Sequence, residues 1–355
     1  LKAQLVKMGV PAYRAAQIRS WLDKGMVDFD EMGNLPAALR GQLKQIFWIP
    51  GIKIKKKLVS ARDNTVKYLY TLWDGENVES VLMQYRHGWS QCISTQVGCK
   101  MGCSFCATGM DGIVRNLLPS EMIAQIEAAQ ADHNVRVSSV VLMGMGEPLQ
   151  NLSNVIPALR LFLDDNGYGL SRRRVTVSTS GLVNQIDKLG SEEPVALAVS
   201  LHAPDDALRD MIMPVNKKHP LEDLMAACRR YLKVAPRDFI TFEYLMLGGI
   251  NDQPKHAREL IELVRTVPCK FNLITFNPFP DSDLKRPERE TVLAFAKILN
   301  DAGIVTTIRK TRGDDIDAAC GQLAGEVKDR TRRAERLLEQ KRAFGILPEQ
   351  QKDRV

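Results

Sequence analysis

Hydrophobic residues recur at helical spacing near the start of the chain, and a strand-like pattern replaces this spacing further along. Leu39 and Leu43, for example, are four positions apart, as one face of a helix requires. Residues 52–95 instead contain alternating apolar and polar positions and runs of β-forming residues, separated by turn residues. The pattern predicts a helical module over residues 1–50 and a small antiparallel β segment over residues 51–90.

Between residues 91 and 310, strand-like runs alternate with helix-like runs. We expect helices such as 120–132, with Ser120 as its N-cap, and 221–232. The expected strands cover residues 92–96, 138–143, 175–179, 195–201, 239–246, 271–276 and 305–309. Such alternation implies a parallel sheet, so the α/β class and a partial (β/α)6 barrel of the TIM type are predicted. Catalytic groups are expected at the carboxyl ends of its strands.

Positive charge is concentrated near the start of the chain. Residues 1–60 contain eleven Lys and Arg against four Asp and Glu, and the whole chain carries a formal charge of +7. This basic module indicates contact with a polyanion, and a solvated basic surface without a partner explains the charge equally well. The last segment, residues 311–355, contains a charged amphipathic helix pattern over residues 316–342.

Three of the seven cysteines, Cys99, Cys103 and Cys106, fall within eight positions. This clustering argues against a secreted disulfide framework and for thiols that stay reduced in the cytoplasm. No apolar run approaches the roughly 20 residues that a membrane helix needs. The first residues also lack the apolar stretch of a signal peptide. We therefore expect a cytoplasmic protein without membrane contact.

The spacing of these three cysteines indicates a metal site. Soft thiolates separated by three and then two residues, in a loop with a glycine, suit one face of a cubane iron–sulfur cluster. Three thiolates leave the fourth iron open, as a cluster that binds a substrate requires. A zinc site completed by Cys92 or a histidine is the main alternative, and three buried structural thiols are another. Zinc sites favour paired Cys-x-x-Cys knuckles, and the sequence has no second pair, so the open cluster is preferred.

The cysteine spacing, with Phe105 just before the third cysteine, resembles the radical S-adenosylmethionine (SAM) superfamily. Further segments resemble the RlmN/Cfr family of RNA methyltransferases: residues 96–99, 105–109, 143–148, 177–181, 200–204, 277–280 and 313–323. The resemblance implies a [4Fe-4S] cluster on the three cysteines and two molecules of SAM per turnover. It also implies SAM contacts at Gly146, Glu147, Ser178, Ser200, Leu201, His202 and Asn277.

The same resemblance implies a catalytic route through two further cysteines. The thiolate of Cys320 would accept a methyl group, because thiolate is the reactive form. After loss of a hydrogen atom, the methylene carbon would add to C2 of an adenine. Cys92 would help to release the product and leave a Cys92–Cys320 disulfide, and Glu79 would accept a proton. Both cysteines could instead be packed core thiols, and Glu79 could be a solvated strand residue.

The family's targets are an adenine of 23S rRNA and the adenosine 3′ of some tRNA anticodons. Both RNAs are therefore expected partners, with an electron donor of flavodoxin type and with the chain as a monomer. Besides the basic module, Arg172, Arg173, Arg174, Lys217 and Lys218 are candidate phosphate contacts.

Three alternatives to C2 methylation of adenine stay open. One is C8 methylation of the Cfr type, against which the segment Gly146-Glu147-Pro148 argues. Another is a radical enzyme acting on a small molecule or a protein, which would not need Cys320. The third, from another class, is a zinc-stabilised RNA-binding protein without catalysis.

Overall fold

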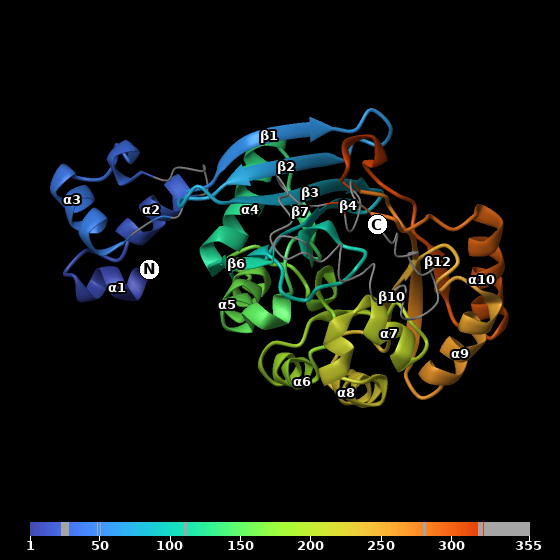
Figure 1. Cartoon of the computed structure of the whole chain (residues 1–355). Coiled ribbons are helices and arrows are strands. Elements are labelled where there is room, and N and C mark those ends of the chain that lie inside the picture. The colour runs from blue at the N-terminus through green and yellow to red at the C-terminus, as the bar shows by residue number, and fades with distance from the viewer. Residues whose placement is uncertain are drawn as a thin grey trace, which may run out of the picture.

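The computed structural model describes residues 1–22, 28–47, 49, 51–109, 112–279, 282–318 and 322. Its N-terminal part contains the short helices α1 (Lys2–Lys7), α2 (Arg14–Leu22), η1 (Phe29–Glu31) and α3 (Ala37–Ile46). Their buried side chains pack into a hydrophobic cluster of their own. Figure 1 shows these helices to one side of the main body. The helices predicted from the hydrophobic periodicity are therefore observed.

Within the described residues, ten strands form one sheet of order β1-β2-β3-β4-β7-β8-β9-β10-β11-β12. Neighbours pair antiparallel among the first four, which are β1 (Lys53–Val59), β2 (Val66–Thr71), β3 (Asn77–Tyr85) and β4 (Gly88–Cys92). β4 then pairs in parallel with β7 (Val137–Leu142). The predicted antiparallel segment is present, and it continues directly into the parallel sheet.

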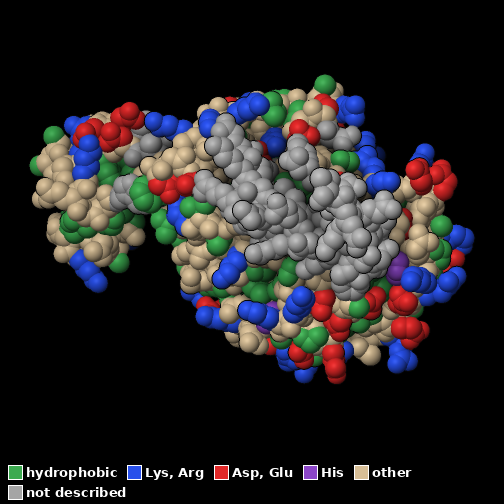
Figure 2. Space-filling view, in the orientation of Figure 1, with side chains coloured by type: hydrophobic (Ala, Val, Ile, Leu, Met, Phe, Trp, Pro, Cys, Tyr) green, Lys and Arg blue, Asp and Glu red, His purple; other side chains and the backbone are tan. Residues whose placement is uncertain are grey.

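β1 is one of the two edges of this sheet, and it is exposed. It carries Lys53, Lys55, Lys56 and Lys57, and most of its residues are solvent-exposed. Figure 2 shows Lys and Arg side chains along the edge of the molecule where β1 lies. Lysines on an edge strand hinder edge-to-edge association, and they also offer cations to a polyanion.

The parallel part of the sheet is covered by helices, as right-handed crossover connections require (Figure 1). After β7, its strands are β8 (Val175–Thr179), β9 (Ala196–Ser200), β10 (Ile240–Met246), β11 (Cys269–Thr275) and β12 (Thr306–Ile308). Its helices are α4 (Pro119–His133), α5 (Leu152–Leu163), α6 (Val183–Glu192), α7 (Asp206–Ile212), α8 (Leu221–Leu232), α9 (Pro254–Val264) and α10 (Arg289–Asp301). The edge strands β1 and β12 do not pair with each other in the described part of the chain. The sheet is thus an open, partial barrel, which confirms the predicted fold class.

Short elements lie in the connections between these strands and helices. β5 (Gln96–Gly98) and β6 (Ile113–Asn116) form a separate two-stranded sheet. The 3-10 helices are η2 (Ala107–Gly109), η3 (Pro148–Asn151), η4 (Arg172–Arg174), η5 (Pro214–Lys218) and η6 (Asp314–Ile316). Searched over the residues that the structure describes, no helix is both long and apolar enough to cross a bilayer.

Two local predictions were wrong. The strand expected over residues 92–96 ends at Cys92, because the tight turn after β3 starts β4 already at Gly88. Ser120 is not an N-cap but lies inside α4, which begins one residue earlier at Pro119. Proline suits the first helical position, and the Glu121 carboxylate accepts the N–H of Leu118 at 2.8 Å in place of a serine cap.

Candidate active site

The three clustered cysteines lie in the connection between β5 and β6 and line one cavity, here called the cysteine cavity. Gly98 sets the start of this loop, because its φ is +73° and an added Cβ would lie 2.0 Å from the carbonyl oxygen of Gly112. The N–H of Cys99 donates to that same oxygen at 2.8 Å. A second anchor is the N–H of Ser104, which donates to the carbonyl of Ile212 at 3.0 Å.

The surroundings of the cysteines suit a cluster of positive irons. Burial raises the pKa of the Cys103 thiol well above its ordinary value, and the nearby Cys106 and Cys99 raise it further. Bound iron would stabilise the Cys103 thiolate, which burial alone disfavours. Among the described residues, no three Cys, His, Asp or Glu side chains form a site for a single metal ion. A cubane gives each thiolate its own iron, so its ligands need not converge on one point.

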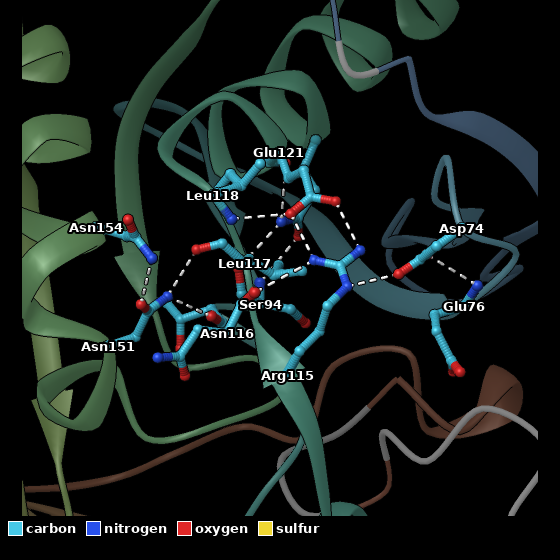
Figure 3. A network of polar contacts seen from close by, with 12 residues as sticks. Asp74, Glu76, Ser94, Arg115, Asn116, Leu117, Leu118, Glu121, Asn151 and Asn154 are labelled. Carbon is cyan, nitrogen blue, oxygen red and sulfur yellow. Dashed lines mark hydrogen bonds and ion pairs between the residues drawn. The ribbon is translucent and has the colours of Figure 1, made fainter.

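The base of the cysteine loop is held by a network of polar contacts (Figure 3). Arg115 of β6 contacts the Glu121 carboxylate with both terminal nitrogens at 2.8 Å, and its Nε lies 2.6 Å from Asp74 in the β2–β3 turn. The guanidinium lowers the pKa of Asp74. Asn151 donates from Nδ2 to the carbonyls of Thr95 and Leu117 at 2.8 Å. The loop is therefore fastened to three neighbouring elements.

The turn after β7 needs glycine at two positions because it passes close to the chain that follows β4. A Cβ on Gly144 would lie 2.7 Å from the carbonyl oxygen of Ile93, and one on Gly146 would lie 2.8 Å from the nitrogen of Gln96. Gly146 also has a φ of +99°, which other residues rarely adopt. The glycines thus place the turn against the wall of the cysteine cavity.

Glu147 follows these glycines and is almost fully buried at the cysteine cavity. Its two carboxylate oxygens accept the N–H groups of Leu149 at 3.1 Å and Ser180 at 2.7 Å. Burial raises its pKa, and these two hydrogen bonds oppose that rise. A carboxylate retains further acceptor positions, so a ligand ammonium group would complete its partners.

His202 lies just after β9 with a φ of +59° and is buried. Its Nδ1 accepts the N–H of Leu245 at 2.9 Å, and its ring stands edge-on to Phe105 at 4.8 Å between centroids. Burial, and then the nearby Arg209, lower its pKa to about 3, so the ring is neutral. The remaining nitrogen, Nε2, then carries the hydrogen and can donate to a ligand.

The structure gathers most of the residues expected to contact SAM. Gly146, Glu147, Ser178, Ser200 and His202 line the cysteine cavity together with the three cysteines. The other two lie elsewhere. The Leu201 side chain belongs to the main core, and Asn277 lies at a neighbouring cavity, where its Oδ1 accepts from Arg286 at 3.0 Å.

Sequence reasoning missed Arg209 of α7, which is fully buried beside this site. Its guanidinium donates to the carbonyls of Ser180, Ser200 and Leu201 at 2.7, 2.9 and 3.0 Å and to Oδ1 of Asn216 at 2.9 Å. Three of these acceptors are main-chain atoms at the carboxyl ends of β8 and β9. Main-chain contacts require no particular side chain, so the sequence pattern did not predict them.

Cys92 lines the neighbouring cavity, here called the Cys92 cavity, with Asn277, Arg312 and Ala318 among its other residues. Met143, Ile274 and Arg309 line both cavities, which are therefore adjacent. Cys92 pairs with Val81 of β3, whose side chain lines the same space. The predicted catalytic thiol is thus buried next to the cysteine cavity.

Glu79 lies two residues before Val81, so its side chain is on the same face of β3 as one wall of the Cys92 cavity. It is buried, and its Oε1 lies 2.9 Å from Nζ of Lys67. Lys67 also donates to the carbonyl of Asp317 at 3.0 Å. This pair therefore connects Glu79 to the segment that precedes Cys320. Cys320 itself, and most of residues 311–355 with the predicted basic helix, lie outside the described residues.

Known families and structures match both parts of the chain. The family described as the radical SAM superfamily matches residues 93–263, and the ribosomal RNA large subunit methyltransferase N-terminal domain matches residues 1–49. A radical SAM methyltransferase from Sphaerobacter thermophilus is 43% identical, covering 91% of this chain and 96% of that chain with a TM-score of 0.85.

More distant structures are also similar in part. A domain of pyruvate-formate lyase-activating enzyme from Bacteroides vulgatus is 21% identical, covering 49% of this chain and 99% of that chain with a TM-score of 0.37. SuiB from Streptococcus suis, bound to S-adenosylmethionine, is 13% identical, covering 64% and 52% of the two chains with a TM-score of 0.46.

Proposed function

The chain belongs to the radical SAM methyltransferases of the RlmN type, and on that premise we propose that it methylates C2 of an adenine in RNA. The 43% identity to a methyltransferase over 91% of the chain supports methyl transfer. The match of residues 1–49 to a ribosomal RNA methyltransferase domain, and the positive charge of residues 1–60, support an RNA substrate. The proposed targets are an adenine of 23S rRNA and the adenosine 3′ of the tRNA anticodon. We further propose that the enzyme acts in the cytoplasm as a monomer.

Cys99, Cys103 and Cys106 are the proposed ligands of a [4Fe-4S] cluster, with SAM in the rest of the cysteine cavity. Two SAM molecules per turnover then supply a methyl group and a 5′-deoxyadenosyl radical, and a flavodoxin-type donor supplies the electron. The Glu147 carboxylate accepts hydrogen bonds from the ammonium group of SAM, and Nε2–H of His202 is a hydrogen-bond donor to SAM. The proposed lining further includes Gly146, Ser178 and Ser200, while Leu201 and Asn277 support it from the core and from the Cys92 cavity.

Cys320 is the proposed carrier of the methyl group. Its thiolate accepts a methyl on sulfur, and the same carbon, after loss of one hydrogen atom, bonds to adenine C2. Glu79 accepts the proton that adenine C2 loses, and the unpaired electron of the adduct would return to the cluster. The Cys92 thiolate then attacks the Cys320 sulfur and breaks its bond to the methylene carbon, which takes up a proton to become the new methyl group and leaves a Cys92–Cys320 disulfide. A reductant must open this disulfide before the next turnover.

One observation carries this assignment of the two thiols. Ala318, the last residue described before Cys320, lines the Cys92 cavity. Ala318 lies two positions before Cys320 in the sequence. A shared reaction and a transient disulfide require two thiols that can meet, so this contact supports the proposal that Cys320 acts together with Cys92.

Peptide mass spectrometry of the purified, active enzyme tests the proposal. We expect the Cys320 peptide to carry one added methyl group on sulfur, because this thiol is loaded before it meets RNA. The Cys228 and Cys269 peptides are internal controls, since burial raises the pKa of both thiols to about 12 and keeps them unreactive. RNA methylated by the enzyme should carry its new methyl at C2 and not at C8. An unmodified Cys320 in active enzyme would contradict the proposed route.

A further inference from the structure

The interior of the partial barrel is open beyond the cysteine cavity. Inward-facing residues alternate along each strand, so Ser178 and Ser200 at the cysteine cavity share a face with Thr176 and Ala198 nearer the amino ends. These amino-terminal positions surround a further cavity, here called the lower lumen. Its strand residues are mostly small or polar: Ser90, Ser139, Thr176, Ala198, Thr241 and Asn272. Barrels of this type are usually filled by large branched side chains.

The lower lumen is strongly cationic. The described residues that line it include Arg173, Arg174, Arg237, Lys270 and Arg309. These five cations come from four separate segments around the barrel, since only Arg173 and Arg174 are neighbours, both on η4. The cations therefore converge on one space and do not form a run along a single exposed face.

Little negative charge in the lower lumen balances these cations. Glu243 is the only carboxylate among the described lining residues, and its Oε1 accepts from Asn272 at 2.8 Å while its Oε2 lies 3.6 Å from Arg309. Burial, and then Arg237, lower the pKa of Lys270; burial, and then Arg173, lower the pKa of Arg237. A bound anion would relieve both the burial and the mutual repulsion of these cations.

The lower lumen connects with the two cavities of the proposed reaction. Arg309 and Met143 line all three, and Glu243 lines both the lower lumen and the cysteine cavity. Tyr85 stands where the lower lumen meets the Cys92 cavity, stacked on His87 at 5.3 Å, with the Arg312 guanidinium 4.4 Å from its ring centroid. Aromatic rings beside cations are typical of sites that hold unpaired nucleotides.

We propose that the lower lumen binds a backbone phosphodiester of the RNA, next to the nucleotide whose base enters the Cys92 cavity. This inference rests on the proposed RNA substrate. An adenine can reach that cavity only if its nucleotide leaves the stack, which brings the flanking phosphates into the barrel opening. The lower lumen has cations on several sides and polar residues on its wall. This lining suits the negative charge of a phosphodiester and does not suit an apolar ligand.

Steady-state methylation of an RNA substrate by the cluster-loaded enzyme tests the inference with Arg174→Gln, Lys270→Gln and the double variant. We expect KM for RNA to rise on the order of tenfold per substitution, with kcat within about twofold. The slope of log KM against log salt should fall by about 0.7–1 per substitution. Each lost cation leaves one fewer phosphate neutralised, so fewer counterions are released when RNA binds. Methylation of Cys320, which needs no RNA, should not change.

The matched control removes two arginines from the outer surface, Arg258→Gln of α9 and Arg265→Gln at its end. Lys270→Arg should keep a near wild-type KM, which separates loss of charge from misfolding. If Arg174→Gln and Lys270→Gln match the control in KM and salt slope, the lower lumen does not bind RNA. Stimulation of the wild type by inorganic phosphate at constant ionic strength would instead assign the site to a free anion. A wild type that methylates no RNA would overturn the proposed function itself.

Discussion

Arg209 places a single fixed charge beneath the carboxyl ends of two strands. It is fully buried, and its donors reach the carbonyls of Ser180, Ser200 and Leu201. Burial lowers its pKa to about 10, so it remains charged at neutral pH. Because the N–H of Ser180 also donates to Glu147, the guanidinium sets the position of the cavity wall at which SAM is proposed to bind.

Arg209→Lys should weaken both the fold and the site. A lysine has three donors on one nitrogen and cannot span three separate carbonyls, so we expect a loss of about 3 kcal/mol in the free energy of unfolding. SAM affinity should fall on the order of tenfold as the wall shifts. Arg230→Lys is the control, because Arg230 of α8 makes a bidentate contact with Asp187 of α6 at the exposed surface. Denaturant titration and equilibrium SAM binding measure the two effects, and equal behaviour of the two variants would refute this role of Arg209.

Site residues whose role depends on their own side-chain type and spacing could be predicted from the sequence. Residues that contact the main chain of other segments could not. Metal ligation would restrict the identity and spacing of Cys99, Cys103 and Cys106, so their spacing indicated a shared site, and the three line one cavity. Gly146 was predictable because close approach excludes any side chain. Arg209 contacts mostly carbonyl oxygens, which every residue possesses, and Arg309 joins three cavities only because β12 ends there. Neither contact leaves a pattern in the sequence.

At the scale of elements, the turn between β1 and β2 holds the segment that leads to Cys320. Asp315 accepts the hydroxyl of Ser60 at 2.7 Å and the N–H of Ala61 at 2.9 Å. Asp63 in the same turn accepts the N–H of Gly313 at 3.3 Å. These contacts join residues about 250 positions apart, so we infer that they help to position the thiol that is proposed to carry the methyl group.

Asp315→Ala removes both acceptors of this contact and should slow RNA methylation on the order of tenfold, because a displaced segment places Cys320 poorly. Cluster content and SAM affinity should stay unchanged, since the side chain of Asp315 bonds to the β1–β2 turn and does not line the cysteine cavity. Asp301→Ala, which removes a surface partner of Lys297 on α10, is the matched control. Single-turnover methylation measures the effect. If Asp315→Ala turns over as fast as the control, the turn does not position Cys320.

The kind of each element was easier to predict than its partners. Local periodicity was enough to predict β8, α8 and most of the parallel strands, because burial on one face imposes a repeat. The continuity of β1–β4 with the parallel sheet depends on the pairing of β4 with β7, about 50 residues away. Such pairing is a long-range choice that local patterns do not encode. The contacts between the β1–β2 turn and residues 313–318 were missed for the same reason.

At the scale of the whole molecule, the chain contains separate hydrophobic cores. Buried residues of α1–α3 form one cluster, whereas the main core draws on the large sheet and its helices from β2 onward. The positive charge of residues 1–60 is shared between these helices and the lysines of β1 (Figure 2). The molecule thus has one basic part suited to binding a polyanion and another part that contains the cysteine cavity.

Removal of residues 1–50 should therefore separate RNA binding from cofactor chemistry. The shortened chain keeps every strand that the structure describes and the whole main core, so we expect it to fold, to hold its cluster and to methylate Cys320. Its KM for RNA should rise at least about tenfold, because seven Lys and Arg leave with the module and fewer phosphates are neutralised. Visible absorption, Cys320 mass spectrometry and RNA methylation measure the three properties on one sample. Loss of the cluster would show that the helices support the barrel, and an unchanged KM would show that RNA is held by β1 and the lower lumen alone.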